Sequence, residues 1–253
     1  MREKRGSIWL EQYRAFIDSF SLNKKFWFSY LFDLIFYFFV IIAFISWGSL
    51  LKRKAESLAG IDYNAMFTGT PQQMDATLNI LQSFLAYLLI SLIVLVLVVI
   101  FLFSIFKGVI WTSLTDKKRD FRYFRNLFFT NLLFYTPLLL ILAFCLWKNL
   151  SIVALVVFLL VLHFNALSIY FLTSGEKLWG SLKSAFKSGF RIHRFLLFYI
   201  IFAVLFLVLD QGFGLIRGNF SSNSSAGITI LVLLVLFLSV VRNGFIKLAD
   251  KIR

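Results

Sequence analysis

The chain of 253 residues has few of the side chains from which disulfides, metal sites and common catalytic centres are built. It contains one cysteine, Cys145, and two histidines, His163 and His193. These can form neither a disulfide within the chain nor a metal site with several Cys or His ligands. A Gly-rich phosphate loop and the HExxH and GxSxG motifs are also missing. We therefore expect no metal, no cofactor and no catalytic residue, and predict that the protein is not an enzyme.

Proline is also scarce, with two residues in the chain. Pro71 follows Thr70 and precedes Gln73 by two positions, which predicts the start of a helix with a Thr cap. Pro137 is the one proline within a predicted membrane span. The sequence therefore lacks the paired Gly and Pro interruptions that mark the broken helices of many transporters.

Acidic residues are few, with 12 Asp and Glu against 26 Lys and Arg and a net charge of +14. No nucleic-acid-binding motif accompanies this positive charge, so we expect no nucleic-acid partner. Hydrophobic residues make up 60% of the chain, which is too many for a soluble domain of this size. Because they gather in long runs, the sequence predicts an all-α polytopic integral membrane protein.

Six apolar stretches define the predicted spans. They cover residues 26–51, 78–106, 127–147, 150–172, 195–216 and 227–246. The intervening segments alternate between basic and nearly uncharged, and those that would share one side of the membrane with both termini hold 21 of the 26 Lys and Arg. Since basic segments stay in the cytoplasm, we predict a single six-span domain, residues 1–253, in the cell membrane with N- and C-termini cytoplasmic.

Three segments on the cytoplasmic side have the spacing of amphipathic helices with a basic face: Ile8–Phe20, Phe121–Phe128 and Lys177–Phe190. We predict that each lies in the head-group region before the chain enters the bilayer. The basic side chains predicted to contact lipid head groups are Lys24, Lys25, Arg122, Arg125, Lys183, Lys187, Arg191 and Arg194. The alternative is that any chain entering a membrane needs such basic and aromatic anchors.

Six polar side chains fall within the predicted spans: Asp33, Asn131, His163, Asn165, Asp210 and Arg242. Counted along the helices, all except Asp210 lie in the cytoplasmic half of the membrane. The sequence therefore predicts one cytoplasm-side cluster of five residues. It could serve as a proton- or ion-coupled site, or it could hold the helices together through an ion pair and amide hydrogen bonds.

Asp33 needs a donor or a proton, because an isolated carboxylate inside a membrane is unfavourable. The basic side chains predicted at a similar depth are His163 and Arg242. We therefore predict that the first, fourth and sixth spans are neighbours. Arg242 is the stronger candidate partner, because a guanidinium stays charged whereas an imidazole changes its charge with pH.

The segment from Gly175 to Lys187, with the sequence GEKLWGSLKSAFK, is followed by a basic junction at Arg191 and an apolar run from Phe195. Over about residues 175–215 the chain resembles the polytopic membrane domains related to the glycerophosphodiester phosphodiesterases. The resemblance implies a multi-span helical bundle. It does not extend to that family's soluble catalytic barrel, so it implies no catalytic residue.

These observations favour a non-enzymatic multi-pass protein that organises membrane lipid or forms part of a membrane complex. The expected partners are the lipid bilayer and its anionic head groups, with other membrane proteins as further candidates. The alternative is a small transporter or channel that uses the cytoplasm-side polar residues. A third hypothesis, an intramembrane enzyme, would require several acidic or His side chains around one cavity.

Overall fold

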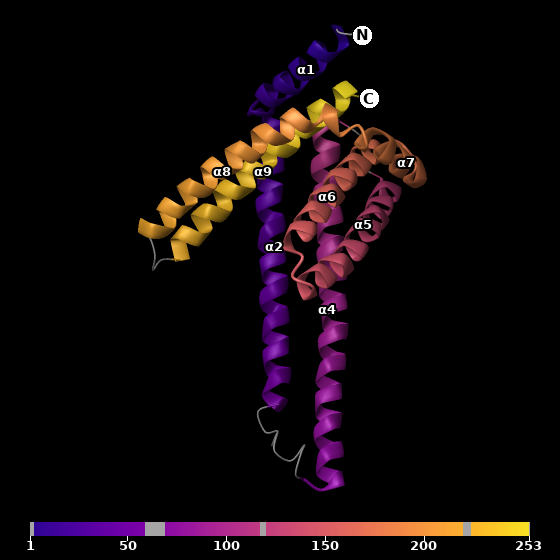
Figure 1. Ribbon diagram of the computed structural model, residues 1–253, viewed down its shortest axis with the longest axis vertical. Helices are drawn as coiled ribbons and strands as arrows, with labels where there is room; N and C mark the ends of the chain where they lie inside the picture. Colours follow the sequence, from indigo (N-terminus) through magenta and orange to yellow (C-terminus); the bar gives the residue numbers. More distant parts are fainter. Residues whose placement is uncertain (1–2, 59–68, 117–119, 220–223, 253) are drawn as a thin grey trace. The chain divides into compact units, whose positions relative to one another are not determined.

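The computed structural model of the protein describes residues 3–58, 69–116, 120–219 and 224–252 (Figure 1). Within these ranges the chain forms eight α-helices and no strand, which confirms the predicted all-α fold class. The helices are α1 (Glu3–Ser19), α2 (Lys24–Ala55), α4 (Pro71–Leu114), α5 (Phe121–Trp147), α6 (Ser151–Thr173), α7 (Leu178–Gly189), α8 (Leu196–Asn219) and α9 (Ser224–Ile252), with 3-10 turns η1 (Glu56–Leu58) and η2 (Ile192–Arg194).

Six of these helices are long and apolar enough to cross a membrane, namely α2, α4, α5, α6, α8 and α9. The six predicted spans are therefore confirmed, and the chain is a multi-pass membrane protein. Every helix extends beyond at least one predicted span boundary. Hydropathy falls at the first polar residues, whereas the hydrogen-bonded backbone of the helix continues through them.

Local capping explains where two of the spans begin. The backbone N–H of Gln73 donates to Thr70 Oγ1 (3.4 Å), and the N–H of Thr70 donates to Gln73 Oε1 (2.9 Å). This capping box confirms the start of α4 predicted from the sequence. Asp120 has the same role at α5, where its Oδ1 accepts from the N–H of Tyr123 (2.7 Å).

The second predicted interfacial segment, Phe121–Phe128, is not a separate helix. It forms the first two turns of α5, which continues without a break to Trp147. Helical spacing alone does not show whether an amphipathic stretch ends or runs on into a span. The structure therefore has two short helices outside the spans, α1 and α7, among its described residues.

The chain divides into two compact units, residues 35–103 and the remainder. In the unit of residues 35–103, α2 and α4 pack through large side chains. The Phe36 and Phe103 rings meet edge to face with centroids 5.8 Å apart, and Trp47 Nε1 donates to Ser91 Oγ (3.1 Å). Most of the remaining apolar side chains of this unit are exposed, as expected of helices that contact lipid. The prediction of a single domain over residues 1–253 stays a prediction.

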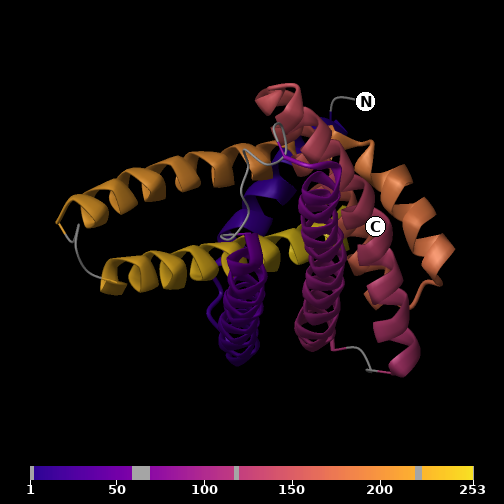
Figure 2. The same cartoon turned by 90° about the horizontal axis from the view of Figure 1, so that it is seen from below.

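The larger unit contains the other helices together with the first part of α2 and the last part of α4. In it α5, α6 and α7 pack against one another, and α1 packs against α9 and the start of α8 (Figure 2). Gly244 of α9 allows this close approach. A Cβ atom there would lie 2.8 Å from both Ser19 Cβ of α1 and the Phe198 ring of α8. All the predicted polar residues belong to this unit.

Candidate functional site

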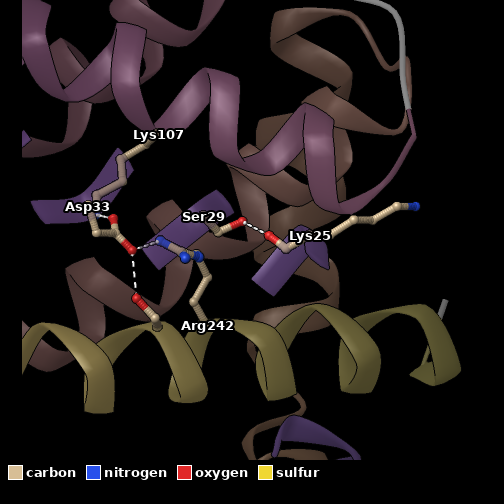
Figure 3. A network of polar contacts seen from close by, with 6 residues as sticks. Lys25, Ser29, Asp33, Lys107 and Arg242 are labelled. Carbon is tan, nitrogen blue, oxygen red and sulfur yellow. Dashed lines mark hydrogen bonds and ion pairs between the residues drawn. The ribbon is translucent and has the colours of Figure 1, made fainter. Parts of the chain in front are cut away.

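Asp33, on the first part of α2, is the centre of a buried network of polar side chains (Figure 3). Its side chain is only 2% exposed. Lys107 of α4 donates to its Oδ1 atom. Its Oδ2 atom accepts from Arg242 Nη1 (2.5 Å) and from Ser239 Oγ (2.8 Å), both on α9. Both carboxylate oxygens therefore have donors, and three helices meet at one residue.

The spacing of the donors along α9 explains how two of them reach one oxygen. Ser239 and Arg242 are three residues apart, so their side chains lie on the same face of the helix. Lys107 is seven residues before the end of α4, and its neighbour Gly108 lies against α5. A Cβ atom on Gly108 would be 2.8–3.0 Å from the rings and methyl groups of Phe124 and Leu127, so this approach requires glycine.

The charges of this network do not cancel. Lys107 and Arg242 carry two positive charges, whereas Asp33 carries one negative charge. The two basic side chains are largely covered, with exposed fractions of 13% and 11%. The Nε atom of Arg242 is buried and has no hydrogen-bond acceptor among the described residues.

Lys107 was missed by the sequence prediction. The second predicted span ended at Phe106, one residue before it, because a charged residue lowers the local hydropathy. The helix in fact continues to Leu114, which places Lys107 well inside α4. The signal that could have found it is the helical continuation from Phe106 through apolar Val109, Ile110 and Trp111.

Asn131 and Asn165 belong to a second set of polar contacts. Asn131 Nδ2 of α5 donates to Ser104 Oγ of α4 (2.9 Å). Asn165 Nδ2 of α6 donates to Asn131 Oδ1 (3.2 Å) and to the Tyr135 hydroxyl (3.1 Å). Both Asn side chains are almost fully buried. Such amide bonds link membrane helices, here α4, α5 and α6.

His163 of α6 has a third set of partners. Its Nδ1 atom lies 2.5 Å from the Tyr199 hydroxyl, and its Nε2 atom lies 3.3 Å from the carbonyl oxygen of Gly189. A carbonyl can only accept, so we assign the imidazole proton to Nε2 and the donor role at Nδ1 to Tyr199. The rings of Phe195 and Phe245 flank the imidazole, with centroids 5.0 and 6.4 Å from it.

The prediction of a single five-residue cluster is therefore wrong in its grouping. Asp33 and Arg242 are in contact, Asn131 and Asn165 are in contact, and His163 bonds to neither pair in the hydrogen bonds described above. The predicted contact of Asp33 with Arg242, between the first and sixth spans, is confirmed. The fourth span contacts the sixth, where the His163 ring meets the Phe245 ring, but the third helix at Asp33 is the second span, which supplies Lys107. Depth along a span predicts which residues share a level, but not which helices are neighbours.

The predicted head-group contacts are mostly on the surface. Lys24, Lys25, Arg122, Arg125, Lys183, Lys187 and Arg191 are exposed, and Arg194 is half-buried. Lys25 forms an ion pair with Asp116. Asp210 of α8 is exposed and separate from the buried networks, as its position in the sequence indicated. Among the residues that the structure describes, no group of three His, Cys, Asp or Glu side chains could hold a metal ion.

Helix α1 is attached to the rest of its unit by polar contacts. Buried Gln12 donates to the carbonyl of His193 (3.2 Å) and accepts from the N–H of Phe198 (3.2 Å) in the first turn of α8. Asn243 Nδ2 donates to the carbonyl of Ser19 at the end of α1 (2.9 Å). The side chain of α9 Lys247 also donates to the end of α1. These contacts satisfy backbone groups that helix ends leave without partners.

The other faces of α1 are exposed. The Phe16 ring meets the Phe202 ring of α8, with centroids 5.4 Å apart. Five other large apolar side chains, on α1 or directly after it, are between 45% and 51% exposed, namely Trp9, Leu10, Tyr13, Ile17 and Phe20. Arg14 and Asp18 are also exposed and form a third, charged face. Helix α1 therefore has a docked face that combines polar contacts with Ala15 and Phe16, an exposed apolar face and an exposed charged face.

Helix α7 combines a buried face with an exposed face that is both aromatic and basic. Leu182 and Ala185 are buried where α7 packs on α6. Trp179 and Phe190 are 75% and 72% exposed, on the same side as exposed Lys183. The predicted apolar stripe, Leu178, Leu182, Ala185, Phe186 and Phe190, is thus divided. Leu182 and Ala185 are buried, whereas Phe190 stays largely exposed although its ring meets the Phe164 ring of α6 with centroids 5.4 Å apart.

No protein-family model, no curated protein and no solved structure matches this chain. The resemblance of residues 175–215 to the membrane domains related to glycerophosphodiester phosphodiesterases therefore stays a prediction.

Proposed function

We propose that the protein is a non-enzymatic multi-pass component of the cell membrane that organises lipid at the cytoplasmic face. The observation that carries this proposal is the arrangement of α1. Its polar face is bonded to α8 and α9, while its apolar face, centred on Tyr13 and Ile17, is exposed. Exposed aromatic and aliphatic side chains on a docked helix are unfavourable in water, whereas they are favourable at the boundary between head groups and acyl chains.

The connection of α1 to the first span supports this location. Only residues 20–23 separate the end of α1 from the start of α2 at Lys24, so α1 stays close to the point where α2 enters the membrane. The exposed Lys24 and Lys25 at this junction can meet lipid phosphates. The charged face of α1 then lies toward the aqueous phase.

Helix α7 supports the same location independently. It lies between two spans, α6 and α8, so it cannot move far from the bilayer surface. Trp179 and Phe190 suit the acyl boundary, and Lys183 on the same side can extend its amine to the phosphates. Two helices outside the spans, α1 and α7, therefore expose large apolar side chains near basic ones, which is the composition of a lipid-binding surface.

The alternative function, a small transporter or channel, requires polar groups that can exchange partners with a substrate. Both oxygens of Asp33 already accept hydrogen bonds, and Asn131 and Asn165 bond to each other. These contacts favour a structural role for the polar residues in the spans. A proton- or ion-coupled role predicts that Asp33→Asn leaves the fold intact and abolishes flux in reconstituted vesicles.

The proposal is tested by measuring the depth of nitroxide labels in vesicles that contain phosphatidylglycerol. Labels are placed at Ile17 and Arg14 of α1 and at Phe190 and Lys187 of α7, in a chain with Cys145→Ala. We expect the labels at Ile17 and Phe190 to be more accessible to oxygen, and the labels at Arg14 and Lys187 to be more accessible to a water-soluble nickel chelate. Equal accessibility within each pair contradicts the proposal. Protection of Ile17 from both reagents would instead support a role in a protein complex.

A further inference from the structure

The Asp33 network has a surplus of positive charge. The charged groups Asp33, Lys107 and Arg242 sum to +1, and all three side chains are 13% exposed or less. A surplus charge in a membrane protein is unfavourable unless an anion or water stabilises it. The network is therefore a place where an additional anion would be attracted.

The position of Arg242 shows which anion could reach it. Asn243, the next residue, bonds to the carbonyl of Ser19 at the end of α1, and Gly244 lies against the Ser19 side chain. Arg242 therefore lies next to the part of α9 that contacts the end of α1. If α1 lies among the head groups, Arg242 lies near the phosphates of the same leaflet.

The chemistry of Arg242 matches a phosphate. Its Nη1 atom binds Asp33, while its Nε atom is buried and has no acceptor among the described residues. A guanidinium offers donors on more than one edge and binds phosphate oxygens in a fork geometry, and an ammonium group such as that of Lys107 adds a second positive charge.

We propose that the network of Asp33, Lys107 and Arg242 binds a phosphate-bearing anion, with Arg242 as its main ligand. The inference rests on the proposed location of α1 at the head groups. Asp33 is the internal counterion of this site. It holds the two basic side chains in place and, as a negative charge, weakens the binding of the incoming phosphate.

The experiment measures ligand retention and thermal stability of the full chain in a neutral detergent. Three probes are compared: dihexanoyl phosphatidylglycerol, dihexanoyl phosphatidylcholine and inorganic phosphate. Native mass spectrometry counts the bound lipids, and the midpoint of thermal unfolding is followed against the concentration of each probe. The variants are Arg242→Gln, Arg242→Lys and Asp33→Asn. Arg14→Gln is the matched control, because Arg14 is exposed on the charged face of α1, which the proposed function places toward the aqueous phase.

We expect the wild-type chain to bind phosphatidylglycerol at one site that Arg242→Gln weakens about tenfold or more, the loss of a charged hydrogen bond. Arg242→Lys should retain part of the binding, Arg14→Gln should not change it, and Asp33→Asn should bind more tightly. Stabilisation by inorganic phosphate as strong as by the lipid would support the phosphate chemistry and assign a soluble ligand.

Equal binding by the wild-type chain and a folded Arg242→Gln variant contradicts the inference, as does weaker binding by a folded Asp33→Asn variant. If Arg242→Gln does not fold, the change in phosphatidylglycerol affinity caused by Asp33→Asn tests the inference by itself: tighter binding supports it and weaker binding contradicts it. The depth of the label at Ile17 is a separate readout. A label at Ile17 that is not at the acyl boundary rejects the proposed lipid surface. If the label is at the acyl boundary but the titration shows no effect of Arg242→Gln, only the phosphate site is rejected.

Discussion

At the scale of single residues, Asp33 is the side chain with the largest expected effect on stability. It joins α2 to α4 and α9, and its replacement leaves Lys107 and Arg242 close together without their shared carboxylate. Removing one partner of a buried ion pair is more unfavourable than never having the pair, because an uncompensated charge stays buried.

We predict that Asp33→Leu lowers the free energy of unfolding in detergent by about 3–5 kcal/mol. Asp33→Asn should lower it less, because the amide oxygen still accepts a hydrogen bond. The measurement is chemical or thermal unfolding followed by circular dichroism. Asp116→Asn is the control, because the Lys25–Asp116 pair is exposed and such pairs contribute about 1 kcal/mol or less. Equal effects of the Asp33 and Asp116 substitutions would show that burial of the network does not matter.

Gly189 is a second position where the addition of a single Cβ atom should have a measurable effect on stability. A Cβ atom there would overlap the Phe164 ring and lie 3.2 Å from His163 Nε2. We predict that Gly189→Ala destabilises the protein by about 1–3 kcal/mol through overpacking between α6 and α7.

Gly212→Ala is the matched control for this prediction. A Cβ atom on Gly212 meets no other atom within 4 Å, and alanine favours the helical conformation. The unfolding midpoint should therefore fall for Gly189→Ala and stay level or rise for Gly212→Ala. A fall of the same size in both variants would argue against close packing at Gly189.

At the scale of elements, α1 depends on hydrogen bonds to its neighbours. Gln12 is fully buried and caps the first turn of α8 through the N–H of Phe198 while also binding the carbonyl of His193. Replacement by an apolar side chain removes the acceptor of the buried Phe198 N–H and the donor to the part-buried His193 carbonyl, and each such loss is unfavourable.

We predict that Gln12→Leu lowers stability by about 1–3 kcal/mol and increases hydrogen exchange of the amides in α1. The control is Arg14→Gln, because Arg14 is exposed on the charged face. Unchanged exchange in α1 of the Gln12→Leu variant would mean that α1 is held mainly by its contacts at Ser19 and Gly244.

The elements show which parts of the fold can be predicted from the sequence. Long apolar stretches located all six spans, and Thr70 with Gln73 located the start of α4, because both signals are local. The contacts of Asp33 and the exposed face of α7 depend on which helices are neighbours. The need of a buried carboxylate for a donor predicted Arg242 as a partner of Asp33, whereas Lys107 was missed because the predicted span ended at Phe106. The burial of Leu182 was not predicted, because helical spacing carries no information about neighbouring helices.

At the scale of the whole molecule, the distribution of charge is the main evidence for orientation. The segments that contain α1, α7 and both termini hold most of the Lys and Arg residues, and such segments stay in the cytoplasm. The proposed lipid surface and the phosphate site both require α1 and α7 to lie on the same side of the membrane. The orientation is therefore the central claim on which the other proposals depend.

Cysteine labelling of intact cells with a membrane-impermeant maleimide tests this claim most directly. Single cysteines replace Lys52, which is exposed at the end of α2, and Lys177, which is exposed before α7, in a chain with Cys145→Ala. We predict that Lys52→Cys is labelled in intact cells and that Lys177→Cys is labelled only after the membrane is permeabilised. Labelling of Lys177→Cys in intact cells, with Lys52→Cys protected, would contradict the orientation and with it the proposed cytoplasmic lipid surface.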